Sequence, residues 1–114
     1  MIRRGQIYWV QLDPTVGSEI NKTRPALVVS NDSNNQVAET VTVLPITSKA
    51  KITRPFEVLV PAGAGGLKTD SKAKANQIRT IDKQRLSANP LGSVLDEAIL
   101  RQISSAIKIH LELP

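Results

Sequence analysis

The sequence has no cysteine among its 114 residues, which excludes disulfide bonds, thiol nucleophiles and zinc–thiolate sites. It has only three aromatic residues, Tyr8, Trp9 and Phe56, so stacking of bases on a platform of aromatic rings is nearly excluded as well. No apolar run approaches the roughly 20 residues that a membrane-spanning helix needs, and no membrane partner is predicted. The lack of cysteine suits a reducing compartment, and we therefore expect a soluble, cytoplasmic protein.

Acidic residues are also fewer than basic ones, with 10 Asp and Glu against 15 Lys and Arg, for a net charge of +5. This balance favours an anionic partner such as nucleic acid, although charge alone does not identify one. The acidic residues are scattered and show no metal-ligand spacing, so no metal or other cofactor is predicted. The single histidine, His110, lies in the last turn of a predicted helix, where a structural or surface role is expected.

Short β-branched and apolar runs, separated by turn-forming residues, predict a series of strands. These are expected over residues 6–12, 25–29, 40–46, 56–60, 72–75 and 77–81. Residues 14–23 predict a long connection, and loops of this length in compact domains are often functional. Residues 31–35 predict a polar turn or one short helical turn, Pro45 the end of a strand or a bulge, and residues 61–66 a flexible turn.

One long helix is predicted near the end of the chain. It is expected to begin near Ser93, whose spacing to Asp96 matches a capping box, and to continue towards Leu111. Its apolar residues recur at helical spacing and are expected to pack on the sheet: Leu95, Ile99, Ile103, Ala106, Ile107 and Leu111. The pattern predicts one mainly β domain with α (α+β) over residues 1–114, in which a small barrel or curled sheet carries a C-terminal helix.

The remaining candidates for chemistry lie at two strand ends. Pro25 biases Arg24 towards an extended backbone, which would hold the guanidinium in a repeatable direction. Thr47 and Ser48 place two hydroxyl groups beside the cation of Lys49. Judged by these residues alone, ordinary strand ends are the simpler interpretation.

Five ordered blocks of sequence give these positions a context. They are Arg4–Tyr8 (RGQIY), Leu12–Glu19 (LDPTVGSE), Arg24-Pro25 with Val28-Val29, Pro45–Ser48 (PITS) and Gln77–Leu86 (QIRTIDKQRL). Through these blocks the chain resembles toxins of the MazF/PemK type, over roughly its first three quarters and with the terminal helix in place. The resemblance implies an SH3-like small barrel, or curled antiparallel sheet, of the MazF/CcdB type.

The resemblance also implies a reaction. In this family the Arg before the Pro of the second strand and the Thr after the Pro-Ile of the third form the catalytic pair, and they fall on Arg24 and Thr47. The implied reaction is in-line attack by a ribose 2′-hydroxyl on the adjacent phosphorus of single-stranded RNA. It leaves a 2′,3′-cyclic phosphate and a 5′-hydroxyl and uses no metal or cofactor. Because a guanidinium is not deprotonated in ordinary protein sites, Arg24 is better suited to stabilise the phosphorane charge than to act as a base. Thr47 is suited to donate a hydrogen bond to the phosphate oxygens, or to help protonate the leaving 5′-oxygen.

By the same resemblance, further residues are candidates for RNA contact. Base contacts are implied for Glu19, Asn31, Ser71 and Gln77, because bases of single-stranded RNA can be read on their edges. Ser48, Lys49 and Lys51, together with Arg54, are candidates beside the chain of phosphates, although a merely solvated basic loop fits that segment equally well. The segment Lys72–Asn76 departs from the more apolar strand common in the family, so the resemblance does not fix the cleavage sequence.

The family forms homodimers and is neutralised by a MazE-like antitoxin, whose disordered and often acidic tail covers the RNA groove. A protein of net charge +5 suits that partner. Two other functions fit the same fold: a CcdB-like toxin that binds gyrase, and a non-catalytic RNA-binding module. The presence of both Arg24 and Thr47 favours RNA cleavage over these alternatives.

Overall fold

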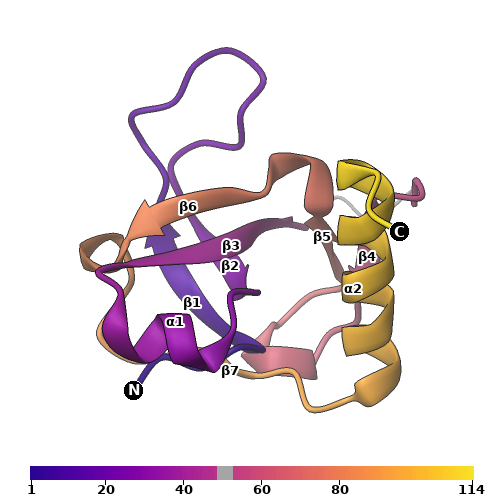
Figure 1. The fold of residues 1–114 in the computed structure, drawn as a ribbon. Helices are drawn as coiled ribbons and strands as arrows, with labels where there is room; N and C mark the ends of the chain where they lie inside the picture. The colour runs from indigo at the N-terminus through magenta and orange to yellow at the C-terminus, as the bar shows by residue number, and fades with distance from the viewer. Residues whose placement is uncertain (49–52) are drawn as a thin grey trace.

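The computed structural model covers the whole chain and describes residues 1–48 and 53–114. The strands in these residues are β1 (Gln6–Gln11), β2 (Thr23–Val28), β3 (Thr40–Thr47), β4 (Glu57–Val60), β5 (Ser71–Lys74), β6 (Arg79–Asp82) and β7 (Gly92–Ser93). The helices are α1 (Asp32–Val37) and α2 (Glu97–Leu111), with short 3-10 turns η1 (Ala64–Gly66), η2 (Ala75–Gln77) and η3 (Lys83–Arg85). Figure 1 shows α2 beside the sheet and the β1–β2 loop projecting away from it.

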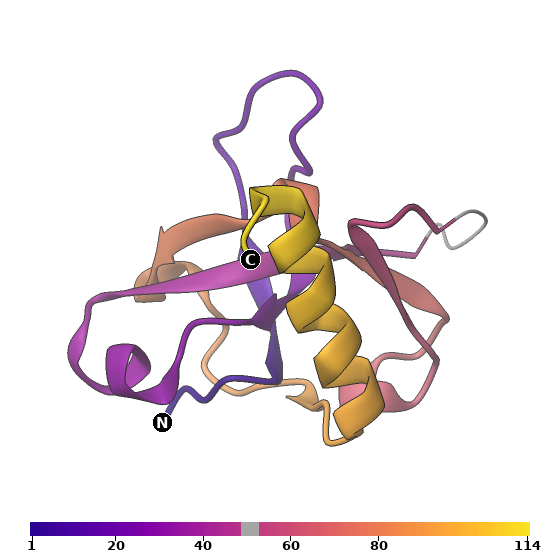
Figure 2. The same cartoon turned by 45° about the vertical axis from the view of Figure 1, so that its right-hand side comes forward.

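The strands form a curled antiparallel sheet in the order β4-β5-β3-β2-β1-β7, with β6 also paired to β3. Strand β3 organises this arrangement, because residues 40–43 pair with β6 and residues 46–47 pair with β5, while β2 pairs with residues 43–45. One long strand thus carries two successive neighbours on one of its edges. Figure 2 shows α2 packed across the sheet from a second direction. The structure confirms the predicted curled antiparallel sheet with a C-terminal helix.

Both faces of the sheet are covered by apolar side chains, as the period of two along each strand requires. The face towards α2 buries, among others, Ile7, Leu27, Leu44, Ile46, Val58, Ile99, Ile103 and Ala106. The opposite face buries a second cluster formed by Tyr8, Val10, Leu12, Ala26, Val28, Val41, Val43 and Ile81. The face on which a candidate site residue lies can therefore be identified from the cluster to which its neighbours two positions away in the strand belong.

The predicted start of the terminal helix is wrong. Helix α2 begins at Glu97, and the carboxylate of Asp96 caps it by accepting the N–H of Ala98. Ser93 lies in β7 and pairs with Gln6 of β1, so it does not belong to a capping box. Tertiary pairing with β1 has overridden the local capping signal. The apolar stripe is confirmed for Ile99, Ile103 and Ala106, which are buried, whereas Leu95 and Leu111 are exposed.

Other local predictions need smaller corrections. Pro45 neither ends β3 nor forms a bulge, since it pairs with Ala26 inside the strand. It lies between the residues that pair with β6 and those that pair with β5, where a missing N–H is tolerated. Residues 64–66 of the predicted flexible turn form the 3-10 turn η1, and Gly66 packs so closely on Leu91 that a Cβ there would lie 2.2 Å from the Leu91 carbonyl oxygen. Of the two alternatives predicted for residues 31–35, the short helical turn is confirmed, and the helix α1 continues to Val37.

No helix within residues 1–48 and 53–114 combines the length and apolar character needed to cross a membrane.

Candidate active site

Arg24 and Thr47 lie at the same end of the sheet on neighbouring strands. The pairing of β2 with β3 runs from Val28–Val43 to Ala26–Pro45 and ends there, so that Arg24 and Thr47 each lie two residues beyond the last pair. Residues opposite each other on paired strands project from the same face. For Arg24 and Thr47 this is the face that carries the second apolar cluster, to which Ala26 belongs. The structure therefore places the two residues predicted from the family pattern at the same end of two neighbouring strands.

The Arg24 guanidinium is partly fixed by the loop that precedes it. Its Nε donates a hydrogen bond to the carbonyl oxygen of Asn21 at 3.2 Å, and the residue is exposed. This contact orients the side chain without using the two terminal nitrogens. These nitrogens can therefore bind two oxygens of one phosphate in a fork, a geometry that suits stabilisation of developing charge.

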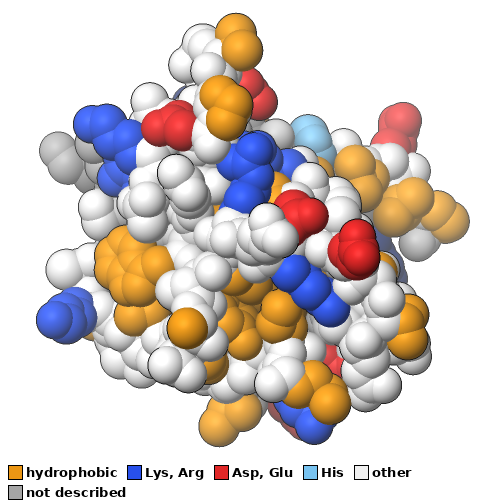
Figure 3. Space-filling model, turned by 90° about the vertical axis from the view of Figure 1, so that its left-hand side faces the viewer, with side chains coloured by type: hydrophobic (Ala, Val, Ile, Leu, Met, Phe, Trp, Pro, Cys, Tyr) orange, Lys and Arg blue, Asp and Glu red, His pale blue; other side chains and the backbone are white. Residues whose placement is uncertain are grey.

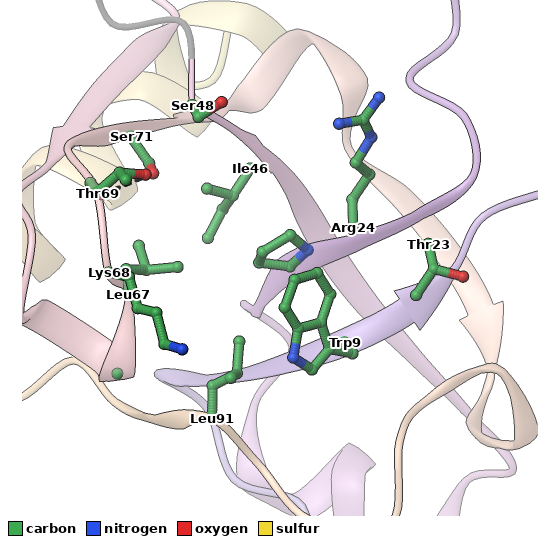
Figure 4. Close-up of a pocket in the computed structure, with 12 residues that line it drawn as sticks. Trp9, Thr23, Arg24, Ile46, Ser48, Leu67, Lys68, Thr69, Ser71 and Leu91 are labelled. Carbon is green, nitrogen blue, oxygen red and sulfur yellow. Dashed lines mark hydrogen bonds between the residues drawn. The ribbon is translucent and has the colours of Figure 1, made fainter.

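A cavity of about 300 Å³ opens on the other face of the sheet, and Arg24 lies at its rim. Its walls are mainly apolar and include Trp9, Pro25, Ile46, Leu67 and Leu91. Figure 3 shows a hydrophobic hollow below the projecting loop, with Lys and Arg side chains on the surrounding surface. Figure 4 shows Ser48 and Ser71 at its upper edge and the Arg24 guanidinium directed away from its centre. Thr47 does not line this cavity, because alternation along β3 turns it away from Ile46 and Ser48.

The β1–β2 loop, residues 12–22, is held against η2 by one side-chain amide. Gln77 accepts the N–H of Ile20 through Oε1 at 3.2 Å and donates to the Ser18 carbonyl through Nε2 at 3.4 Å. Glu19 lies in the same loop and accepts the N–H of Val16 at 2.6 Å. A second hollow, of about 380 Å³, lies between loop and η2 and includes Glu19 and Gln77. The structure thus brings together two of the predicted base-contacting residues, which are 58 positions apart in the sequence.

The base of this loop is fixed by two arginines for which the sequence alone gave no role. Arg79 donates to the Leu12 carbonyl at 3.0 Å, and Arg85 donates to the carbonyls of Gln11 and Asp13 at 3.0 and 2.7 Å. Both belong to the Gln77–Leu86 block, and their partners lie in or next to the Leu12–Glu19 block. The two sequence blocks therefore contact each other in the fold. The occurrence of both blocks in the chain was the only sequence signal that could have indicated a role for these arginines.

The other predicted RNA-contacting residues have different positions. Ser71 is buried and donates its hydroxyl to the Thr69 carbonyl at 2.9 Å, whereas Ser48 is exposed at the rim of the apolar cavity. Asn31 lines neither of the two hollows, and its side chain caps α1 by accepting the N–H of Asn34. Lys49 and Lys51 lie outside the described residues.

A buried carboxylate accompanies the site on the Thr47 side of the sheet. Glu57 of β4 forms ion pairs with Lys72 at 3.2 Å and Lys74 at 3.4 Å, and its side chain is only 3% exposed. Burial opposes its charged form. The N–H of Arg54, the hydrogen bond and charge of Lys72, and Lys74 outweigh burial and lower the pKa of Glu57 below its ordinary value of 4.5. The two lysines that depart from the family's apolar strand are therefore partners of a buried acid.

Among the described residues, no three His, Cys, Asp or Glu side chains lie close enough together to hold a metal ion.

The curled antiparallel sheet with a C-terminal helix is the fold of small toxins of the MazF type. The family of PemK-like, MazF-like toxins of type II toxin–antitoxin systems matches residues 3–111, and the chain belongs to this family. It is 48% identical to the endoribonuclease MazF9 of Mycobacterium tuberculosis, covering 99% of this chain and 98% of that protein. It is 39% identical to the endoribonuclease EndoA of Bacillus subtilis, covering 99% and 97%.

Solved structures show the same fold. MazF from Deinococcus radiodurans superposes with a TM-score of 0.83 at 28% identity, over 98% of this chain and 97% of that one. A mycobacterial endoribonuclease in complex with its cognate antitoxin superposes with a TM-score of 0.81 at 27% identity, over 100% and 98%.

Proposed function

We propose that this protein is a sequence-specific endoribonuclease toxin that cleaves single-stranded RNA, messenger RNA included, and thereby inhibits translation and growth. The observation that carries this function is the placement of Arg24 and Thr47 at one end of the sheet in a chain of this toxin family. The relatives that are named endoribonucleases align with nearly the whole chain. The reaction uses no metal or cofactor.

The proposed chemistry is a transesterification within the RNA. The 2′-oxygen forms a bond to the adjacent phosphorus, the bond from phosphorus to the 5′-oxygen breaks, and the proton lost from the 2′-hydroxyl is balanced by one gained at the leaving oxygen. Arg24 stabilises the negative charge on the non-bridging oxygens, because its fork geometry matches them in pairs. Thr47 donates a hydrogen bond at the same phosphate.

Sequence selection belongs to the residues around this pair. Glu19 and Gln77 share the hollow beneath the β1–β2 loop, which supports their role as base contacts. Ser48 and Ser71 line the apolar cavity on the other side of Arg24. Contacts of RNA with Asn31, Lys49 and Lys51 remain predictions from the family resemblance.

The protein acts in the cytoplasm as a homodimer and is neutralised by a MazE-like antitoxin. The mycobacterial relative whose solved structure contains its cognate antitoxin supports this partner. The net charge of +5 complements an acidic antitoxin tail. The gyrase-binding and non-catalytic alternatives would need neither Arg24 nor Thr47, and the relatives' names favour cleavage.

The test is incubation of the purified chain with a long unstructured RNA in the presence of EDTA, followed by mapping of the cut sites and their end groups. We expect discrete cuts that carry cyclic-phosphate ends. Arg24→Ala should slow cleavage by about 10²–10³-fold, as loss of one charge-stabilising donor does in other enzymes. Arg101→Ala is the matched control, because that arginine lies on α2 with its side chain 73% exposed. Intact RNA with the wild-type chain, or Arg24→Ala activity within a few-fold of wild type, would contradict the proposal.

A further inference from the structure

A row of side chains crosses the sheet through Thr47. In the pairing of β3 with β5, Thr47 lies directly opposite Lys72, and in the pairing of β5 with β4, Lys72 lies opposite Leu59. Arg24 and Thr47 each lie two residues beyond Ala26–Pro45, the last pair of β2 with β3, at the same end of the two strands. Directly opposite residues have Cβ atoms roughly 4.5–5.5 Å apart and share a face. Thr47 therefore has Lys72 directly opposite it on β5, and Arg24 lies at the same end of β2, the other neighbouring strand.

The Lys72 ammonium is held in place beside this row. It donates to Glu57 Oε1 at 3.2 Å, and its side chain is 12% exposed. Lys74 contacts the other oxygen of the same carboxylate at 3.4 Å. Two ammonium groups share one carboxylate, so the cluster carries a net charge of +1. A positive charge that is held in place by neighbouring side chains is suited to binding an anion without further ordering of the side chain.

Glu57 alone does not account for both lysines. Lys74 lies directly opposite Glu57 in the register, where it can neutralise the buried carboxylate. Lys72 is not directly opposite Glu57 but two residues away from that position in β5. It lies opposite Leu59 of β4 on one side and opposite Thr47 of β3 on the other. One cation is sufficient to balance one carboxylate, and the second adds like-charge repulsion within a strand of four residues. The position of Lys72 beside Thr47 provides a reason for the second cation.

We propose that Lys72 binds a phosphate group of the RNA next to Thr47, so that Arg24 and Lys72 hold the chain of phosphates from both sides of the Thr47 hydroxyl. Glu57 is a positioning residue, because it holds the Lys72 ammonium at the face of the row. This inference rests on the proposed endoribonuclease function. It also accounts for the departure of this strand from the apolar pattern common in the family.

The test compares Lys72→Gln with its matched control Lys74→Gln, which removes the other cation from the same carboxylate. The probe is an RNA that contains the cleavage site found for the wild type, with a 2′-deoxy sugar at the cut position so that it binds but is not cleaved. We expect Lys72→Gln to lower the slope of log affinity against log salt concentration by about 0.7, the value for one contact with a single-strand phosphate. Lys72→Arg should restore the slope, and Lys74→Gln should leave it unchanged.

Unfolding temperatures of the variants separate a structural effect from loss of binding. If Lys72→Gln does not fold, the same comparison is made with Lys72→Met and Lys74→Met, which keep the apolar stem of each side chain and remove its charge. Equal salt slopes for the Lys72 and Lys74 variants, in a wild-type protein that cleaves RNA, would overturn the role of Lys72 alone. A wild-type chain that neither cleaves nor binds RNA would instead contradict the proposed function and this inference with it.

Discussion

At the scale of single residues, the buried Glu57 makes stability depend on pH in a defined direction. Its pKa in the folded protein lies below the ordinary value of 4.5, because hydrogen bonds and lysine charges outweigh the effect of burial. The stabilisation is therefore fully present above about pH 4.5 and is lost as the pH falls through the folded-state pKa.

We expect Glu57→Gln to lower the free energy of unfolding at pH 7 by about 1–3 kcal/mol, since two partly buried lysines lose their acceptor. The difference from wild type should shrink as the pH falls below 4.5 and through the lowered folded-state pKa, where the wild-type carboxylate becomes protonated. Urea unfolding at both pH values measures the two differences. Glu39→Gln, which changes an exposed carboxylate, is the control. A Glu57→Gln effect of the same size at both pH values would show that the charge of Glu57 does not stabilise the fold.

At the scale of elements, the start of α2 offers a direct comparison between the local sequence signal and the structure. Asp96 caps the helix through its carboxylate, whereas Ser93 lies in β7. Asp96→Ala should therefore lower the free energy of unfolding by about 1 kcal/mol. Ser93→Ala should stay within about 0.5 kcal/mol of wild type, as surface substitutions usually do. Thermal or urea unfolding measures both changes in the free energy of unfolding. A larger loss of stability for Ser93→Ala than for Asp96→Ala would support the predicted capping box and contradict capping by Asp96.

The same elements show how far the sequence could predict the fold. Strand positions followed from period-two patterns, and the apolar stripe of α2 followed from its helical period, because both signals are local. The short β7 carries no such pattern in Gly92-Ser93 and forms only through its pairing with β1. Pro45 was predicted to end a strand or form a bulge, because proline cannot donate a backbone hydrogen bond. It is tolerated inside β3 because it lies between the residues that pair with β6 and those that pair with β5, and no local sequence pattern shows this change of partner.

The site was predictable to a different extent. Arg24 and Thr47 were assigned through family blocks, and their common face follows only from the register of two strands. Gln77 was assigned to base contact, yet its hold on the β1–β2 loop joins residues 57 and 59 positions apart. The pairing of Lys72 and Lys74 with Glu57 is equally non-local. The sequence patterns therefore predicted which residues belong to the site. The contacts between these residues could be identified only from the folded structure.

At the scale of the whole molecule, the two faces of the sheet present different surfaces at the Arg24 end. One face carries the row of Arg24, Thr47 and Lys72, and the other carries the apolar cavity beside Trp9. Arg24 lies at the boundary, as a member of the row and at the rim of the cavity. A partner with both acidic and apolar residues is suited to cover both surfaces at once. A disordered antitoxin tail that folds on binding can wrap two such surfaces.

Trp9 makes the contact of such a tail measurable, because it is the sole tryptophan and its side chain is partly exposed at the cavity. We expect the acidic C-terminal peptide of the cognate antitoxin to inhibit RNA cleavage and to change Trp9 fluorescence at the same peptide concentrations. Both effects should weaken as salt is raised, because opposite charges contribute to the binding. Trp9→Phe should abolish the fluorescence change while leaving salt-sensitive inhibition in place. Inhibition by the peptide without any change in Trp9 fluorescence would mean that the tail covers the Thr47 face and leaves the apolar cavity open.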